Sequence, residues 1–350
     1  MKVGIITFHW ATNYGAILQT YALQTALENL GTNVEIINYK PSKFDYSFRN
    51  FFNNRRFLHL CEYCKERIKE NNLKKFRKDK LKCSRRYFNE DSLSAVSNEY
   101  DVLITGSDQV MNSYFLQYGE KGGSTAYFLG FGDSNTRKLA YAVSFGTVNY
   151  PKDLCKTVNK LIARFYALSV RENSGVEIIK SMGRNDALLV PDPTLLLNIT
   201  EYKKLLPKNL DRKEITFVYL LHNRKSFLEQ LQKKSNSFPL KISAEEGLIE
   251  WLSNIYTARA MITNSYHGVI FCLIFHIPFV VVLPTLNNEG MNDRFFTLLD
   301  RLGLSNRIRT EENFDISLLH NIINWDFIDK TISDFREIGL KYLKENITKS

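Results

Sequence analysis

The chain has 350 residues, of which 44% are hydrophobic and 24% charged, a composition typical of a soluble globular protein with room for two domains. No apolar run approaches the ~20 residues that a membrane-spanning helix needs, and the start MKVGIITFHW is typical of a buried first strand rather than a signal peptide. The five cysteines form no even disulfide framework, so we expect reduced thiols and a cytoplasmic chain.

The first half of the chain predicts alternating strands and helices. Apolar runs favour strands at 2–8, 33–39, 100–106, 138–146, 165–172 and 186–193. After the first of these, apolar residues recur every three or four positions, which predicts a helix over 14–31 that ends at Gly31. Buried runs of this length, separated by helices, are typical of a parallel sheet covered on both faces.

The second half repeats this alternation. We expect strands at 214–221, 259–264 and 277–283, helices at 224–235, 247–258, 266–276 and 292–304, and then a helical tail. The predicted fold class is therefore α/β, with two doubly wound Rossmann-like domains that face a cleft. We place the first domain at 1–200, the second at 201–330, and a C-terminal helix at 331–350 that packs back on the first domain.

The positive charge is concentrated in one segment. Residues 49–86 hold fourteen Lys and Arg against four acidic residues, an excess equal to the net charge of +10 of the whole chain. We expect a basic helical insertion over 44–90 in the first domain. Nucleic-acid binding is the weaker interpretation, because no nucleic-acid fold accompanies the charge. Cys61 and Cys64 have CxxC spacing, but no second ligand pair follows at a zinc-like distance, so we predict no metal site.

Candidate functional residues follow three strands of the first half. They are His9, Asn13, Tyr14 and Gly15 after 2–8; Ser107, Asp108, Gln109 and Asn112 after 100–106; and Arg171 and Glu172 at the end of 165–172. A loop that opens onto a helix N-terminus favours an anion or a sugar oxygen, although Asn13 is also typical of a helix cap. Asp108 can accept a proton, and the alternative is an Asx turn. Arg171 suits bidentate anion binding, and we disfavour an Arg171–Glu172 pair because adjacent strand residues point to opposite faces.

The stretch TNSYHGVIF stands where the strand 259–264 gives way to a helix. Its candidate residues are Ser265, Tyr266, His267 and Gly268, and the stretch MNDRFF adds Asn292 and Arg294 at another helix start. A neutral histidine is suited to proton transfer near neutral pH. The alternative is a core histidine bonded to a backbone carbonyl, a role that we assign instead to His276 among its apolar neighbours.

Taken in order, these motifs resemble the polysaccharide pyruvyl transferase family. The resemblance rests on NYGAILQTYALQ, GSDQVMN, YAVSFG, SVRE, PDPTLLL, NSYHGVIF and NDRFFTLLDRLGL, and it covers nearly the whole chain except the basic insertion and the tail. The family commonly has Trp at the position of Met111 and Phe at that of Tyr266. Relatives also carry an Arg two positions before the motif histidine, where this chain has Ser265.

The resemblance implies a fold like that of GT-B glycosyltransferases and a phosphoenolpyruvate-dependent ketal-pyruvate transferase. Such an enzyme moves the enolpyruvyl group onto two hydroxyls of one sugar in a bacterial surface-polysaccharide precursor, as in capsule or exopolysaccharide, releases phosphate and requires no cofactor. We assign proton transfer to His267, with Asp108 or His9 as its counterpart. Because Ser265 stands where relatives have Arg, we assign the donor's charge to Arg171 and Arg294, and substrate binding to the other candidate residues.

The family's acceptors are often sugars on a polyprenyl diphosphate at the inner face of the cell membrane. We therefore expect a cytoplasmic protein in peripheral contact with an anionic membrane through 44–86, where each Lys or Arg contributes ~1 kcal/mol. The alternative is a solvated helical hairpin. Two other functions stay open: a GT-B glycosyltransferase that uses a nucleotide-sugar, with Glu245 and Glu246 ahead of a helix, and a non-catalytic scaffold in polysaccharide assembly.

Overall fold

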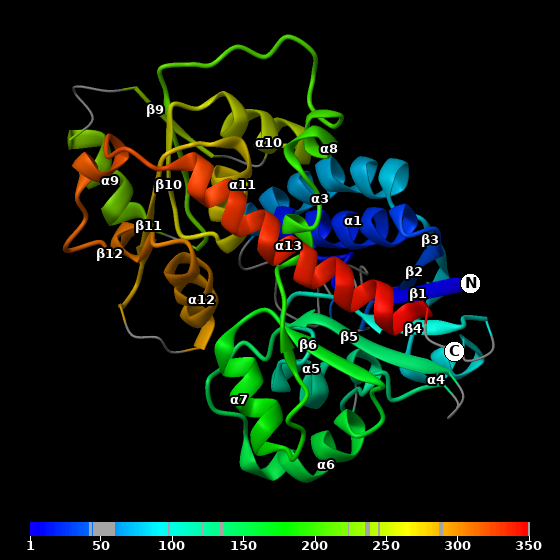
Figure 1. The fold of residues 1–350 in the computed structure, drawn as a ribbon. Coiled ribbons are helices and arrows are strands. Elements are labelled where there is room, and N and C mark those ends of the chain that lie inside the picture. The colour runs from blue at the N-terminus through cyan, green and yellow to red at the C-terminus, as the bar shows by residue number, and fades with distance from the viewer. Residues whose placement is uncertain are drawn as a thin grey trace. The chain divides into compact units, whose positions relative to one another are not determined.

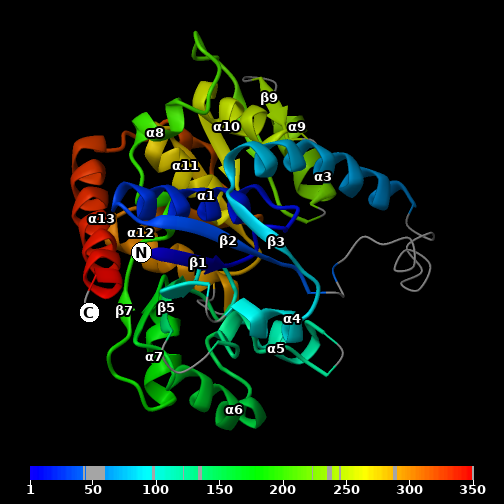
Figure 2. The same cartoon turned by 90° about the vertical axis from the view of Figure 1, so that its right-hand side faces the viewer.

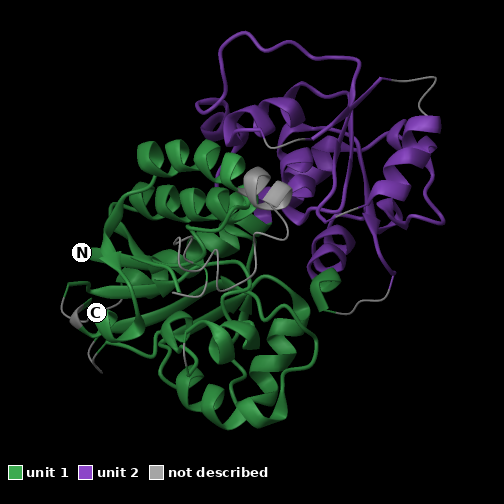
Figure 3. Cartoon of the chain, turned by 180° about the vertical axis from the view of Figure 1, so that it is seen from behind, with its two compact units in different colours: residues 1–196, 289–293, 335–350 green, residues 197–288, 294–334 purple. Residues whose placement is uncertain are grey.

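The computed structural model describes residues 1–41, 44, 60–96, 99–120, 122–132, 136–222, 224–234, 239–243, 246–286 and 290–348. The chain divides into two compact units, coloured separately in Figure 3. Unit 1 comprises residues 1–196, 289–293 and 335–350, and unit 2 comprises 197–288 and 294–334. In the described part of the chain, no helix is both long and apolar enough to cross a membrane.

Unit 1 is built on a seven-stranded sheet in the order β3-β2-β1-β4-β5-β6-β7, in which every neighbouring pair is parallel (Figure 1). Its strands are β1 (Lys2–Ile6), β2 (Asn33–Tyr39), β3 (Cys83–Tyr87), β4 (Val102–Thr105), β5 (Arg137–Val143), β6 (Ala167–Val170) and β7 (Leu188–Leu189). The central strands are buried along nearly their whole length, which is why their sequences are continuous apolar runs rather than alternating ones.

Helices cover both faces of this sheet. They are α1 (Tyr14–Asn29), α3 (Leu60–Lys80), α4 (Glu90–Leu93), α5 (Ser113–Tyr118), α6 (Lys152–Ile162) and α7 (Asn173–Ser181). Figures 1 and 2 show α1 and α3 on one face and α6 and α7 on the other. Helix α1 begins after Asn13, whose side chain accepts a hydrogen bond from the backbone N–H of Ala16, and it is followed by Gly31 as predicted.

Unit 2 holds a five-stranded parallel sheet in the order β12-β11-β10-β8-β9. Its strands are β8 (Thr216–Tyr219), β9 (Leu240–Ile242), β10 (Ala260–Thr263), β11 (Phe279–Leu283) and β12 (Ile308–Thr310), and its helices include α8 (Ile199–Lys203), α9 (Lys225–Lys234), α10 (Leu248–Thr257) and α11 (Tyr266–Phe275). Helix α12 (Asp293–Arg301) follows β11. The long apolar run 268–283 divides into helix α11 and strand β11, as predicted.

Helix α13 (Trp325–Thr348) begins in unit 2 and ends in unit 1. In its second half, the Tyr342 hydroxyl donates a hydrogen bond of 2.9 Å to the Ala140 carbonyl of β5. A Cβ added at Gly339 would lie 2.5 Å from the Tyr141 hydroxyl oxygen. The absence of a side chain at Gly339 therefore allows the helix to pack closely on the sheet of unit 1.

The basic helical insertion expected over 44–90 is helical in part of its described residues. The described part contains helix α3, but it also contains β3, which pairs in parallel with β2 and extends the sheet. Strands β9 and β12 were missed as well. All three are edge strands with partly exposed residues, so their sequences lack the apolar runs that identify the central strands. The aromatic-rich part of the insertion at 45–59 lies outside the described residues.

Candidate functional site

The polar loops of unit 1 meet where the direction of the strand order reverses. Strands β1 and β4 are neighbours, β2 and β3 follow β1 toward one edge, and β5 to β7 follow β4 toward the other. Ligands of doubly wound sheets bind at such a point, outside the carboxyl ends of the strands. Here the Thr7 hydroxyl donates a hydrogen bond of 3.0 Å to the Ser107 carbonyl. A Cβ at Gly106 would lie only 3.0 Å from the Thr7 Cβ, so glycine permits this close approach of the two loops.

A buried arginine holds the loop after β4. The Arg171 side chain is 0% exposed, and its guanidinium contacts three carboxylates: Asp192 at 3.0 Å, Glu172 at 3.3 Å and Asp108 at 3.4 Å. The pair with Glu172 that the sequence argument disfavoured does form, because strand β6 ends at Val170 and both residues lie beyond it, where strand alternation no longer applies. These contacts favour a positioning role for Arg171 over direct binding of the donor's charge.

Asp108 is the most accessible of these carboxylates. Its side chain is 16% exposed, against 0% for Asp192 and 4% for Glu172. Its backbone has a φ of 78°, in the left-handed region that Asp tolerates better than most residues, and its carboxylate accepts a hydrogen bond from the Gln109 N–H. The loop therefore presents one carboxylate to solvent while Arg171 holds it in place.

Three other predicted residues of this loop also have structural contacts. The buried Ser107 hydroxyl donates to the Ala142 carbonyl at 2.9 Å. Asn112 caps helix α5 and donates to the Gln109 side-chain oxygen at 3.2 Å. These bonds fix the loop, so the Asx-turn and helix-cap alternatives account for part of its polar content.

The residues that follow β1 divide between the core and the loop surface. Tyr14 and Gly15 are buried in the first turn of α1, and the Lys69 ammonium of α3 lies 4.3 Å from the centre of the Tyr14 ring. Asn13 caps the helix, as the alternative interpretation held. Tyr14 therefore packs between helices α1 and α3. Because its side chain is buried, the structure does not support its predicted contact with substrate.

In unit 2, a histidine and an arginine are joined through a tyrosine at the start of helix α11. The rings of Tyr266 and His267 lie 5.6 Å apart, and the Arg294 guanidinium carbon lies 5.4 Å from the centre of the Tyr266 ring. His267 and Arg294 are buried, at 6% and 8% exposure. All three follow strand β10 or β11, and the helix N-terminus beside them favours an anion.

The remaining predicted residues of unit 2 support this corner. Ser265 is the N-cap of α11, and its hydroxyl accepts a hydrogen bond of 3.2 Å from the Gly268 N–H. Asn264 exchanges two hydrogen bonds with the backbone of Leu221 after β8, which ties together the ends of two neighbouring strands. Asn292, which the sequence groups with Arg294 at this helix start, belongs to unit 1.

His276 was assigned wrongly. It is not a core histidine bonded to a backbone carbonyl: its Nε2 lies 2.9 Å from an Asp329 carboxylate oxygen, its ring stacks on Trp325, and its side chain is 38% exposed. It follows the last turn of α11 with a φ of 55°, so the chain turns it toward α13 rather than into the core.

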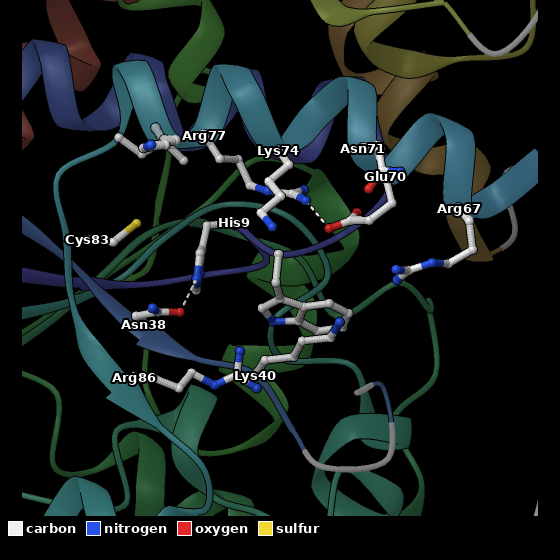
Figure 4. Close-up of a pocket in the computed structure, with 13 residues that line it drawn as sticks. His9, Asn38, Lys40, Arg67, Glu70, Asn71, Lys74, Arg77, Cys83 and Arg86 are labelled. Atoms are coloured by element: carbon white, nitrogen blue, oxygen red, sulfur yellow. Dashed lines mark hydrogen bonds and ion pairs between the residues drawn. The ribbon is translucent and has the colours of Figure 1, made fainter. Parts of the chain in front are cut away.

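A basic cavity of about 560 Å³ opens beside the carboxyl ends of β1 and β2 and along β3 (Figure 4). Helix α3 forms one side of it, and the strands and the loop after β1 form the other. Its cationic lining residues are Lys40, Arg67, Lys74, Arg77, Lys78 and Arg86. Among the described residues that line it, Glu70 is the single carboxylate, and it is ion-paired with Arg77 and accepts a hydrogen bond from Thr12.

His9 lies in this cavity, and its surroundings keep it neutral. Its Nδ1 is 3.2 Å from the Thr7 carbonyl and its Nε2 is 3.2 Å from the side-chain oxygen of Asn38. The pKa of His9 is lowered to about 4, mainly by burial and also by the nearby guanidinium groups of Arg77 and Arg86, which together outweigh the two hydrogen bonds. A histidine with this pKa is uncharged at pH 7 and is better suited to hydrogen bonding than to donating a proton.

The basic residues were expected on a surface, and the cavity that several of them line was not predicted. The signal was present: Arg67, Glu70, Asn71, Lys74, Arg77 and Lys78 recur every three or four positions and so share one face of α3. Asp192, which holds Arg171, was quoted in the motif PDP but given no role. Among the described residues, no group of three His, Cys, Asp or Glu side chains has the arrangement of a metal site.

Comparisons with known proteins agree with this architecture. Among solved structures, the chain resembles the UDP-GlcNAc 2-epimerase of Methanocaldococcus jannaschii, with 12% identity, a TM-score of 0.50 and coverage of 95% of this chain and 92% of that one. It also resembles the UDP-GlcNAc 2-epimerase of Neisseria meningitidis bound to UDP-GlcNAc, with 8% identity, a TM-score of 0.50 and coverage of 100% and 95%. At these identities the likeness shows the fold alone, and the predicted α/β class of two GT-B-like Rossmann domains is confirmed.

The sequence itself identifies the family. No curated protein matches the chain significantly. The sequence model of the family described as polysaccharide pyruvyl transferase matches residues 13–285, a span that includes the loops after β4, β6 and β10. Because this match covers well over half of the chain, the protein belongs to the polysaccharide pyruvyl transferase family.

Proposed function

We propose that the protein transfers the enolpyruvyl group of phosphoenolpyruvate to two hydroxyls of one sugar in a surface-polysaccharide precursor, with release of phosphate. Family membership supports the pyruvyl transfer. The observation that carries the choice of donor is the grouping of His267, Tyr266 and Arg294 at the N-terminus of α11. A guanidinium beside a helix N-terminus suits a donor that carries both a carboxylate and a phosphate.

The chemistry needs one proton donor and one proton acceptor. His267 delivers a proton to the terminal enol carbon, which becomes the methyl group, and a sugar hydroxyl adds to the resulting cationic carbon as it loses its own proton. A second hydroxyl then attacks the same carbon, the bond from that carbon to the phosphate oxygen breaks, and the departing phosphate takes up the proton of the second hydroxyl. The products are a cyclic ketal and inorganic phosphate, so the atoms balance without an oxidant or reductant.

The residues of unit 1 serve the acceptor in this proposal. Asp108 is the carboxylate of the loop after β4 that is open to solvent, and it accepts the proton of the attacking hydroxyl. Arg171 acts through Asp108 as a positioning residue, because its own side chain is fully buried among carboxylates. His9, with its pKa near 4, serves as a hydrogen-bonding partner rather than as the acid.

A peripheral membrane contact through 44–86 stays a prediction, as does a polyprenyl-diphosphate-linked acceptor. Within that segment the structure describes residues 44 and 60–86, and several of its cations line the basic cavity. Flotation with vesicles of anionic phospholipid tests the contact. Loss of flotation on reversing the charge of Lys75 and Lys80, which do not line the cavity, supports it, and unchanged flotation contradicts it.

The test of the function is phosphate release from phosphoenolpyruvate with a panel of lipid-linked and aryl glycosides, followed by mass spectrometry of the sugar. We expect release only with a suitable acceptor, and a mass gain of one pyruvic acid less one water. His267→Ala removes a general acid and should lower the rate by about 10²-fold or more. His320→Ala is the matched control, because His320 is an exposed histidine of the same unit.

Three results would contradict the proposal. One is an unchanged rate in a folded His267→Ala variant. A second is the absence of phosphate release across the whole panel, together with no shift of the melting temperature by phosphoenolpyruvate. The third is acceptor-dependent turnover of a nucleotide-sugar instead, which would indicate a glycosyltransferase.

A further inference from the structure

We propose that the basic cavity of unit 1 binds the diphosphate group of a phosphorylated ligand. The cavity holds six cationic side chains and a single described carboxylate, and that carboxylate is already paired with Arg77. Like charges that line one cavity repel one another, and an anion with several oxygen acceptors relieves this repulsion. The proposal that the cavity binds a diphosphate rests on this arrangement alone and does not depend on pyruvyl transfer.

The cations converge from two sides. Arg67 and Lys74 project from α3 into the cavity, and Figure 4 shows Lys40 and Arg86 on the opposite side, which comes from β2 and β3. Arg77 lies on the same helix, with its guanidinium turned toward Glu70. Two facing rows of cations can contact both phosphates of a diphosphate at once. A flat basic surface would instead spread its charges over one plane.

The burial of Lys40 favours a ligand that enters the cavity over a membrane surface. Lys40 is only 6% exposed, and its ammonium lies 5.4 Å from the centre of the Trp10 ring. A bilayer headgroup region does not reach a lysine buried to this extent unless a single headgroup leaves the plane. A soluble or extended diphosphate ester can enter the cavity and reach Lys40.

The neutral groups of the cavity suggest what the diphosphate carries. His9, Asn38 and Asn71 line it together with the Trp10 ring. Side-chain amides bond to hydroxyls, and an aromatic ring covers the apolar face of a sugar. A volume of about 560 Å³ lies within the range of ~300–1,000 Å³ typical of small-molecule sites. The cavity therefore fits a glycosyl diphosphate rather than inorganic phosphate alone.

The link to the acceptor is the part that rests on the proposed function. If the chain pyruvylates a sugar, the cavity holds the diphosphate at the reducing end of that acceptor, in the same unit as Asp108. Removing a cation from the cavity should then raise KM for a diphosphate-linked acceptor and leave kcat nearly unchanged, since uniform binding energy is lost. KM for an acceptor without phosphate should not change.

The direct test is titration calorimetry of the full chain with inorganic pyrophosphate and with a soluble glycosyl diphosphate. Lys74→Gln and Arg86→Gln each remove one cation from the cavity, and each should weaken binding by about tenfold or more, as expected for a lost hydrogen bond to a charged group. Lys75→Gln is the matched control: it is the neighbouring lysine of α3, it is exposed, and it does not line the cavity. The affinity of the Lys75→Gln variant for either diphosphate should stay within about twofold of that of the wild type at 0.15 M salt.

The outcomes separate the two proposals. Pyrophosphate binding that depends on Lys74 and Arg86, without turnover of phosphoenolpyruvate, supports the cavity and rejects the proposed function. Turnover without any pyrophosphate binding does the reverse. Equal weakening by Lys75→Gln, or binding only to phosphatidylglycerol vesicles and not to either soluble diphosphate, overturns the cavity proposal.

Discussion

Replacing Arg171 by Met should destabilise unit 1 strongly, because it leaves a buried group of carboxylates without their cation. The Arg171 side chain is 0% exposed and lies 3.0 Å from Asp192, whose side chain is also 0% exposed. Met has a similar length and no charge, so the variant removes the ion pair while filling most of the space. We expect a loss of stability rather than a rearrangement of the loop.

The structure allows the size of this loss to be worked out. Removing one partner of a buried ion pair costs about 3–5 kcal/mol, since the other charge stays desolvated. Asp192 keeps two hydrogen-bond donors in the variant: the Thr194 N–H at 3.0 Å and the Thr194 hydroxyl at 2.7 Å. These bonds place the expected loss toward the lower end of that range, at about 3 kcal/mol.

Urea unfolding of the wild type, Arg171→Met, Asp192→Asn and the double variant measures the effect. We expect the double variant to be more stable than the sum of the single losses predicts, with a coupling of about 1–3 kcal/mol. Lys82→Met is the control: its ion pair with Glu28 lies on the surface of the same unit, with 66% of the lysine side chain exposed, and should contribute at most about 1 kcal/mol. A loss below about 1 kcal/mol for Arg171→Met, or no coupling with Asp192, would refute the reasoning.

Three further predictions concern unit 1. The pKa of His9 is lowered to about 4 in the folded state, from about 6.5 in the unfolded state, so about 3 kcal/mol of folding stability is lost as the pH falls from 6.5 to 4. His9→Gln should lack this part of the pH dependence when its free energy of unfolding is measured against pH. The same pH dependence in the wild type and the variant would contradict the prediction. Gly339→Ala should lower the melting temperature despite a gain in helix propensity of about 1 kcal/mol, because its Cβ would lie 2.5 Å from the Tyr141 hydroxyl; a raised melting temperature would show that α13 shifts freely. Gly106→Ala should cost about 1–3 kcal/mol through contact with Thr7 at 3.0 Å, and unchanged unfolding in urea would show that the two loops can separate.

Much of the fold is written in the order of the residues. The central strands are buried on both faces, so their apolar runs identify them without any tertiary information. The candidate loops could be located for the same reason, because polar residues directly after such a run must lie at the carboxyl end of a strand. The family motifs around Asp108 and His267 fall at these ends, as the sequence predicted.

The tertiary structure decided what the sequence order leaves open. Edge strand β3 is partly exposed, so its pairing with β2 depends on neighbours far along the chain. Arg171 and Asp192 lie 21 residues apart, and their contact sets Arg171 to hold the loop rather than to bind a ligand. The periodicity of the cations of α3 likewise defines one face of the helix, but it does not say what that face packs against. Only the packing of α3 beside β1, β2 and β3 makes one face of a basic helix the lining of a cavity, because a cavity is formed by surfaces that meet and not by either surface alone.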